Sequence, residues 1–265
     1  MVITFLTDFG LQDDFVGTCH GVIAQIAPDV RVIDVTHGIA PQAVLQGALV
    51  LKNTTAFMPV GVHLAVVDPD VGGNRRAIGI GTRDGRTFVG PDNGLLLIAA
   101  DELGIDSAHE LSEPRYRLPE VSRTFHARDV FAPAAAHLAT GVALDELGQA
   151  IDPAELVRVE VPEPRVGAAQ IGATVLAVDR FGNIATNVRR EHVDALGVQD
   201  GDQIEIRLAL DRYFAVVAGT FADAPPGELI LYEDSYALVT LAISRGNAAR
   251  LTGVTVGDEL RIART

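Results

Sequence analysis

The sequence predicts an α/β fold, with an N-terminal α/β sheet domain over residues 1–160 and a smaller all-β, barrel-like domain over residues 161–265. In the first part, strand-like apolar runs alternate with helical patterns, as they do in an α/β sheet. At the boundary, the segment VPEPRVG contains two prolines and a glycine and indicates a linker. Beyond it the apolar runs are short and separated by Gly, Pro and Asp, which favours a small barrel.

Periodicity places the individual elements. The first domain has the strand-like runs VITFL, VRVID, VHLAVV and AIGIG, and helical patterns over residues 14–26, 41–52 and 129–140. Asp84-Gly85 lies between AIGIGT and RTFVG and predicts a hairpin at that point. The second domain is expected to contain the strands ATVLAV, QIEIRL, YFAVVAG, ELILY, ALVTLAI and ELRIA.

Composition limits the class of protein. A chain of 265 residues that is 48% hydrophobic and 21% charged can bury a substantial core. No apolar run approaches membrane-spanning length, and Met1 leads directly into a strand pattern, so a soluble cytoplasmic protein without a membrane partner is expected. Cys19 is the one cysteine and lies in a helical apolar pattern, which favours packing and excludes an intrachain disulfide.

Charge excludes further functions. The net charge of -14 argues against nucleic acid as a partner, because phosphate binding requires a basic surface. Lys52 is the one lysine, which leaves little room for covalent catalysis by lysine. The chain has no GxxxxGK[ST] loop, and the glycines near residue 80 do not open a helix as a dinucleotide fingerprint should.

Acidic turns follow several of the apolar runs. Asp8, Asp68 and Asp92 come after VITFLT, VHLAVV and RTFVGP. Because parallel strands bring their carboxyl-end loops to one crevice, these aspartates can converge on one ligand. Asp34 and His37 invite a metal interpretation, but two ligands are too few for a metal site.

These turns lie within seven motifs that run through nearly the whole chain: TDFGLQDDFVG, DVTHGIAPQAVLQGA, HLAVVDPDVGGNRR, FVGPDNGLL, TFHARDVFAPAAAHLA, DRFGNIATN and RGNAA. With these motifs the chain resembles the S-adenosyl-L-methionine (SAM) hydroxide adenosyltransferases, which are related to fluorinating and chlorinating enzymes. The resemblance implies an enzyme that hydrolyses SAM to adenosine and L-methionine by attack of activated water at C5′. It implies no cofactor and no metal.

Three residues would act on water. On sequence alone, Asp68 starts a turn, Arg75 is a solvated charge and His126 is a structural histidine. The resemblance implies instead that this catalytic set holds and activates the attacking water, and it leaves open which member is the base. Halogenating relatives carry aromatic residues at the positions of Asp68 and His126. One alternative function is a halide-dependent adenosyltransferase, which the ionisable side chains at these two positions disfavour. The other alternative is a non-catalytic adenosine or SAM sensor.

A second set would bind substrate. The acidic turn also suits helix capping, and DRFGN also suits a strand-ending turn. The resemblance implies ribose binding by Asp8, contact with the methionine portion by Asp13, and adenine contact by Phe181 and Asn183. It implies further contacts with the methionine end by Asp179, Ser235 and Tyr236, backbone contacts with adenine at Asn247 and Ala248, and a second adenine-packing ring in Phe221.

The resemblance also implies a homotrimer in which each pocket lies between the first domain of one chain and the second domain of its neighbour. Four positions depart from the family pattern: His20 for lysine, Asp70 for glycine, which is expected to strain its turn, and Asp234 and Ala237 for Asn and Gly. His63 is expected to be structural. Residues Pro91 to Gly94 have the composition of a tight turn and are not expected to belong to the catalytic set.

Overall fold

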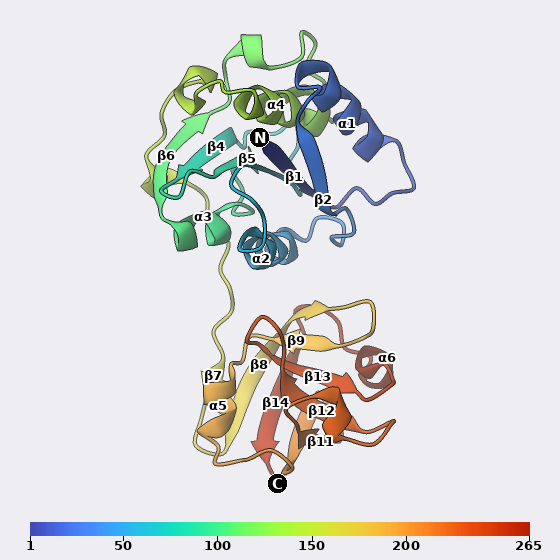
Figure 1. Cartoon of the computed structure of the whole chain (residues 1–265). Helices are drawn as coiled ribbons and strands as arrows, with labels where there is room; N and C mark the ends of the chain where they lie inside the picture. The colour runs from blue at the N-terminus through green and yellow to red at the C-terminus, as the bar shows by residue number, and fades with distance from the viewer. The chain divides into compact units, whose positions relative to one another are not determined.

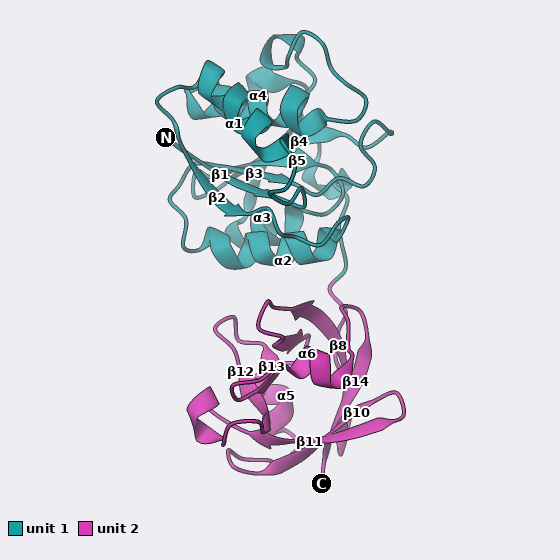
Figure 2. Cartoon of the chain, turned by 90° about the vertical axis from the view of Figure 1, so that its right-hand side faces the viewer, with its two compact units in different colours: residues 1–160 teal, residues 161–265 magenta.

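The computed structural model describes residues 1–265, which divide into two compact units, residues 1–160 and 161–265 (Figure 2). The predicted fold class is confirmed, because the first unit is a mixed sheet covered by helices and the second is a closed barrel. No helix is long and apolar enough to span a bilayer.

The first unit is built on a six-stranded sheet with the order β2-β1-β3-β5-β4-β6. Strands β2, β1, β3 and β5 are parallel neighbours, whereas β4 runs antiparallel to β5 and β6. The start of β4 therefore lies at the same edge as the carboxyl ends of the parallel strands. The strands span Val2–Thr7 (β1), Arg31–Thr36 (β2), Val62–Val66 (β3), Ala77–Thr82 (β4), Thr87–Pro91 (β5) and Ile105–Glu110 (β6).

Helices cover both faces of this sheet (Figures 1 and 2). One face carries α1 and α4 and the other carries α2 and α3. Strand residues supply both cores by alternation, since Phe5 packs with the α1 and α4 cluster and Leu6 with the α2 and α3 cluster. The helices span Phe15–Ile26 (α1), Val44–Thr55 (α2), Leu97–Leu103 (α3) and Ala132–Ala139 (α4).

Three details test the expected elements. The Asp84-Gly85 hairpin is confirmed, because β4 and β5 pair antiparallel around it and Gly85 has a φ of 87°. The helix expected over 129–140 begins with a π-helical turn, η2 (Ala127–Phe131), before α4. Cys19 is fully buried in α1, and burial raises the pKa of its thiol to about 12, so its role is packing.

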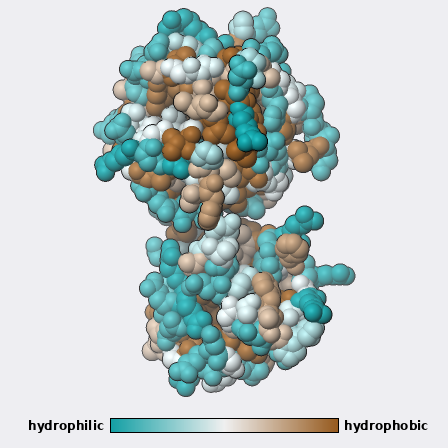
Figure 3. Space-filling model, viewed as in Figure 1, coloured by the Kyte–Doolittle hydropathy of each residue, from teal (hydrophilic) through white to brown (hydrophobic).

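The second unit closes seven strands into a barrel in the order β14-β10-β11-β12-β13-β9-β8, with β14 pairing back onto β8 and β7 added outside β8. Residues such as Ile171, Ile204 and Ile262 fill its interior. The face seen in Figure 3 is mainly hydrophilic in this unit. The strands span Arg165–Val166 (β7), Gln170–Val178 (β8), Ile184–Thr186 (β9), Gln203–Leu208 (β10), Asp211–Val217 (β11), Leu229–Glu233 (β12), Val239–Ile243 (β13) and Glu259–Arg264 (β14).

Short helices complete the two units. In the second unit, α5 (Arg190–Asp194) and α6 (Ala248–Thr252) lie between barrel strands. The remaining elements are single 3₁₀ turns: η1 (Pro114–Tyr116), η3 (Leu144–Leu147), η4 (Pro153–Glu155) and η5 (Phe221–Asp223).

His63 lies inside the first sheet. It sits opposite Thr4 on β1 and Phe88 on β5; its Nδ1 is 2.8 Å from the Thr4 hydroxyl, and its ring stacks on Phe88 with centroids 5.0 Å apart. The residue is fully buried and Nε2 has no hydrogen-bond partner. Burial, helped by the nearby Arg86 charge, lowers the pKa of His63 from 6.5 to about 4. These contacts support the structural role.

This buried histidine predicts an acid-sensitive stability. Between pH 6.5 and about 4 the unfolded state binds the proton more readily, so the free energy of unfolding falls as pH decreases through that window. His63→Gln, which does not titrate, should flatten this part of the profile by up to about 3 kcal/mol. Urea denaturation from pH 7 to 4 measures the effect, with His192→Gln as the control. Equal slopes in wild type and His63→Gln would refute the assignment.

Candidate active site

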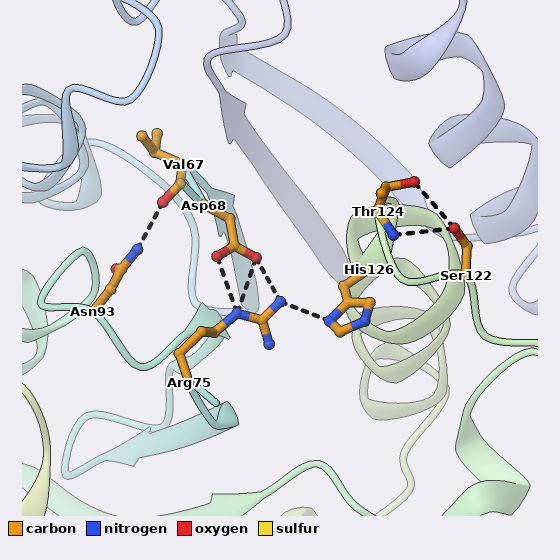
Figure 4. Close-up of polar contacts among 7 residues, drawn as sticks. All are labelled: Val67, Asp68, Arg75, Asn93, Ser122, Thr124 and His126. Atoms are coloured by element: carbon orange, nitrogen blue, oxygen red, sulfur yellow. Dashed lines mark hydrogen bonds and ion pairs between the residues drawn. The ribbon is translucent and has the colours of Figure 1, made fainter. Parts of the chain in front are cut away.

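Three side chains meet at the carboxyl edge of the first sheet (Figure 4). Asp68 follows β3, Arg75 precedes β4 and His126 precedes η2. Arg75 Nε donates to both Asp68 carboxylate oxygens at 3.0 Å, and its Nη2 donates to Oδ2 at 2.5 Å. The same Nη2 lies 2.7 Å from His126 Nδ1. The sequence-predicted catalytic set is therefore one hydrogen-bonded cluster.

Backbone contacts hold the two loops of this cluster together. Gly72 has a φ of 78°, and a Cβ at this position would overlap the carbonyl oxygen of Arg123, so only glycine permits the close approach. Asn93 Nδ2 donates to the carbonyl oxygen of Val67 at 2.8 Å and fixes the end of β3. The buried Asp129 carboxylate accepts from the Ser122 amide at 2.7 Å and anchors the loop that leads to His126.

The cluster fixes a tautomer. A guanidinium has donors and no acceptor, so the Arg75 contact requires a lone pair on His126 Nδ1 and places the imidazole proton on Nε2. Burial and the Arg75 charge lower the pKa of His126, and the Asp68 charge opposes them. Arg75 and Asp68 have side chains only 8% and 6% exposed, and the Arg75 guanidinium lies 5.2 Å from the centre of the Phe131 ring. A neutral imidazole thus faces a paired, nearly buried cation.

Asp8 and Asp13 lie in the loop after β1. Asp8 Oδ2 accepts from the backbone N–H of Gln42 at 2.8 Å. Gln42 has a φ of 67°, a conformation that costs energy in residues other than glycine. Asp13 is exposed. Neither carboxylate makes a hydrogen bond to the Asp68 cluster, so the structure places them at the same edge without joining them to it.

An aromatic group that sequence reasoning missed connects these loops. Phe9 and Phe15 flank the acidic turn, and each packs edge-on against Phe125, with ring centroids 6.0 and 5.2 Å apart respectively. Phe125 immediately precedes His126. The sequence signal was available, because a phenylalanine stands on each side of the turn and one stands beside the histidine.

Asp92 reaches the same edge but is engaged elsewhere. Its Oδ2 accepts from Arg76 Nε at 2.8 Å and its Oδ1 accepts from the Val157 amide at 2.9 Å, and the residue is only 4% exposed. The predicted convergence of Asp8, Asp68 and Asp92 on one ligand therefore does not extend to Asp92, which ties the last segment of the first unit to the sheet.

The second unit holds a separate polar cluster in the loop after β8. Asp179 Oδ1 accepts from the amides of Phe181 and Asn183 at 2.8 and 2.9 Å, and Oδ2 accepts from Asn183 Nδ2 at 2.7 Å. Phe181 is 68% exposed. These three residues border an open hollow of about 570 Å³, and Phe221 lies on it with Tyr232, their rings 4.8 Å apart.

The remaining substrate-set residues lie in two other loops of this unit. Ser235 and Tyr236 are exposed in the β12–β13 hairpin, where Asp234 Oδ1 accepts from the Tyr236 amide at 2.8 Å. Asn247 caps α6 by accepting from the Arg250 amide at 2.7 Å. Ala248 is fully buried, backbone included.

Two of the positions that depart from the family pattern, Ala237 and Asp70, differ in backbone conformation. Ala237 has a φ of 59°, the left-handed region in which glycine is favoured. Asp70 is not among the non-glycine residues with positive φ, so the expected strain in its turn is wrong. Its loop closes instead through a Gly73 amide that donates to the Asp70 carbonyl at 2.9 Å.

The fold and its clusters define a class of two-unit proteins, in which an α/β sheet unit with an ionisable cluster at its carboxyl edge precedes a closed β-barrel unit. The chain belongs to the SAM hydroxide adenosyltransferase family: the family's N-terminal domain matches residues 3–148 and its C-terminal domain matches residues 173–261. The resemblance found in the sequence is confirmed.

Similar proteins agree with this membership. A protein from Salinispora tropica named (R)-S-adenosyl-L-methionine hydrolase is 47% identical over 98% of this chain and 97% of its own. One of the same name from Thermus thermophilus is 36% identical over 98% of each chain, and a fluorinase from Actinopolyspora mzabensis is 29% identical over 100% of this chain and 97% of its own. The crystal structure of an uncharacterized conserved protein from Thermotoga maritima matches with a TM-score of 0.91 at 35% identity, over 99% of this chain and 100% of that chain.

The contact between Arg75 and His126 predicts a measurable pKa change. Arg75→Gln removes a positive charge and leaves the Asp68 carboxylate, so the His126 pKa should rise from its lowered value. NMR titration of the imidazole resonances measures this shift. His137, whose pKa is lowered by burial alone, serves as the internal control and should not move. An unchanged His126 pKa would show that the guanidinium does not contact the ring in solution.

Proposed function

We propose that this protein hydrolyses SAM to adenosine and L-methionine in the cytoplasm. The observation that carries the proposal is the hydrogen-bonded cluster of Asp68, Arg75 and His126, which offers one cation, one carboxylate and one imidazole at one place. Family membership supports the substrate, since relatives at 36–47% identity carry the name (R)-S-adenosyl-L-methionine hydrolase. That name also specifies the (R) form, which we take as the preferred epimer at sulfur.

The reaction needs an oriented water and a proton acceptor. A water oxygen attacks C5′ of the substrate, the C5′–S bond breaks with its electron pair moving to sulfur, and L-methionine leaves as a neutral thioether. No acid is required for that leaving group. The water loses one proton, so the catalytic demand falls on positioning and deprotonation.

The tautomer of His126 determines which part each residue of the cluster can take in activating water. His126 carries its proton on Nε2 while Nδ1 is occupied by Arg75, so the ring is a donor toward the water oxygen. Asp68 Oδ1 accepts only from Arg75 Nε at 3.0 Å and retains a lone pair for the proton. We therefore assign Asp68 as the acceptor, His126 as the group that holds the oxygen, and Arg75 as the cation that stabilises developing hydroxide.

Substrate binding is assigned to the other loops. We propose that Asp8 accepts from the ribose hydroxyls and that Asp13, Ser235 and Tyr236 receive the methionine portion. Phe181 would stack on adenine, since its ring is 68% exposed beside an open hollow. Asp179, Asn183 and the backbone at Asn247 and Ala248 complete the proposed binding set.

Assembly is part of the proposal. We propose a homotrimer in which each active site takes the Asp68 set from one chain and the Asn183 set from a neighbouring chain. Mixing Asp68→Ala chains with Asn183→Ala chains should then restore activity, because some sites receive two intact sets. Chain exchange is verified by mass measurement of the mixed oligomers. Exchange without recovered activity would exclude shared sites.

The central experiment is product analysis. Purified protein incubated with each SAM epimer should give adenosine and L-methionine by chromatography, faster from the (R) epimer than from the (S) epimer, and the rate should not depend on chloride or fluoride. The reason is that the Asp68 carboxylate repels a halide at the position where water is held. A halogenated nucleoside would identify the halide-dependent alternative, and binding without turnover would identify a sensor.

Two variants locate the chemistry and serve as controls for a contaminating hydrolase. His126→Ala should lower kcat by about 10²-fold or more while adenosine affinity changes little. Asp8→Ala should weaken adenosine binding by roughly 1–3 kcal/mol, because buried hydroxyls lose their acceptor. Steady-state kinetics and calorimetry separate the two effects. Normal turnover by His126→Ala would remove it from the catalytic set.

A further inference from the structure

We propose that His20, Asp34 and His37 form a binding site for a divalent transition-metal ion of the zinc type. His20 lies on α1, Asp34 lies on β2, and His37 follows the end of β2. One donor atom from each residue lies within 4.8 Å of the other two. The site uses none of the residues assigned to water activation or substrate binding.

The distances suit coordination. Asp34 Oδ1 lies 2.9 Å from His20 Nε2 and 3.1 Å from His37 Nε2. Ligands about 2.0–2.1 Å from a tetrahedral ion are separated by roughly 3.3 Å. Both Asp34 distances are therefore within a few tenths of an ångström of that separation, and all three donor atoms lie within 4.8 Å of one another.

The buried His37 side chain independently indicates a ligand at this place. Its side chain is 3% exposed, and its Nε2 is buried without a hydrogen bond, since the 3.1 Å approach to Asp34 lacks hydrogen-bond alignment. A buried ring nitrogen without a partner costs free energy unless something else satisfies it. The inward direction of this nitrogen, toward Asp34 and His20, makes a metal ion the partner that fits.

The surroundings already orient the ring. His37 Nδ1 is 2.8 Å from the Thr7 hydroxyl, which can accept from Nδ1–H and so leave the Nε2 lone pair available. Phe5 packs edge-on against both imidazoles, with centroids 4.9 Å from His37 and 5.9 Å from His20. Support of a metal-ligating histidine through its other nitrogen is a general feature of metal sites.

The donor set selects the kind of ion. Two imidazoles and one carboxylate suit Zn²⁺ and similar ions, whereas Mg²⁺ and Ca²⁺ require mainly oxygen ligands. His20 and Asp34 have side chains 35% and 45% exposed, so an ion can enter from solvent and keep a water in the fourth position. The net charge of -14 favours the approach of a dication.

Binding would join α1 to the end of β2, beside the loop that contains Asp8. Thr7, which contacts His37, immediately precedes Asp8, and the His37 carbonyl oxygen accepts from the Gly10 amide at 2.7 Å. An ion that joins α1 to the end of β2 would therefore stiffen the loop after β1. It stabilises the folded state by an amount that rises with the logarithm of the free ion concentration above the dissociation constant, and it takes no part in the hydrolytic step.

The test measures Zn²⁺ binding by chelator-treated full-length protein through competition with a chromophoric chelator. Wild type should bind one Zn²⁺ per chain, gain melting temperature with Zn²⁺ but not with Mg²⁺, and give a tetrahedral visible spectrum with Co²⁺. His20→Ala, at a partly exposed position, should bind Zn²⁺ at least about tenfold more weakly. His192→Ala, at a histidine of the other unit, should bind as wild type does.

Two results overturn the proposal. The first is a wild type that binds Zn²⁺ no better than His20→Ala. The second is equal weakening by His192→Ala, which would indicate dispersed binding to surface histidines. Circular dichroism of each variant confirms that it is folded. The conservative Asp34→Asn variant keeps the side-chain shape and should also bind Zn²⁺ more weakly, because it lacks the carboxylate ligand.

Discussion

Parallel pairing of β2, β1, β3 and β5 is the constraint on which the first unit depends, because it delivers the loops that follow all four strands to one edge. The antiparallel β4 begins at that edge and adds two adjacent arginines. Successive residues of an extended segment point to opposite sides. Arg75 therefore pairs with Asp68 and joins the His126 cluster, whereas Arg76 pairs with Asp92 and secures the end of the unit.

The Asp68 and Arg75 pair is nearly buried, which makes it a poor source of net stability. Removing two charges from water costs about as much as their attraction returns, and a well-packed apolar pair is often as stable. What the pair does supply is a cation whose position is fixed from two sides by the carboxylate and by the Phe131 ring. A preorganised cation is what a developing hydroxide requires, so the arrangement is better explained by chemistry than by folding.

The sequence predicted the fold class, the Asp84-Gly85 hairpin and the packing role of Cys19, since each depends on local pattern or composition. The roles of Asp68, Arg75 and His126 came from family resemblance, because the residue types alone favoured ordinary structural roles. Contacts across elements could not be predicted from pattern. One example is the close approach of Gly72 to the Arg123 carbonyl oxygen. Another is the contact of His20 on α1 with Asp34 on β2, because periodicity does not determine how a helix is aligned with a strand.

The loop after β8 in the second unit combines an exposed aromatic ring, Phe181, with a polar side chain of fixed orientation, Asn183. Asp179 uses Oδ1 on two amides of its own loop and Oδ2 on Asn183 Nδ2. That last bond fixes the amide orientation, so the Asn183 carbonyl oxygen is the acceptor left for a ligand. An acceptor beside the exposed Phe181 ring suits the amino edge of a purine. In the proposed binding mode, Asp179 would therefore act first by ordering its loop, and then by the charge that it offers to the methionine end.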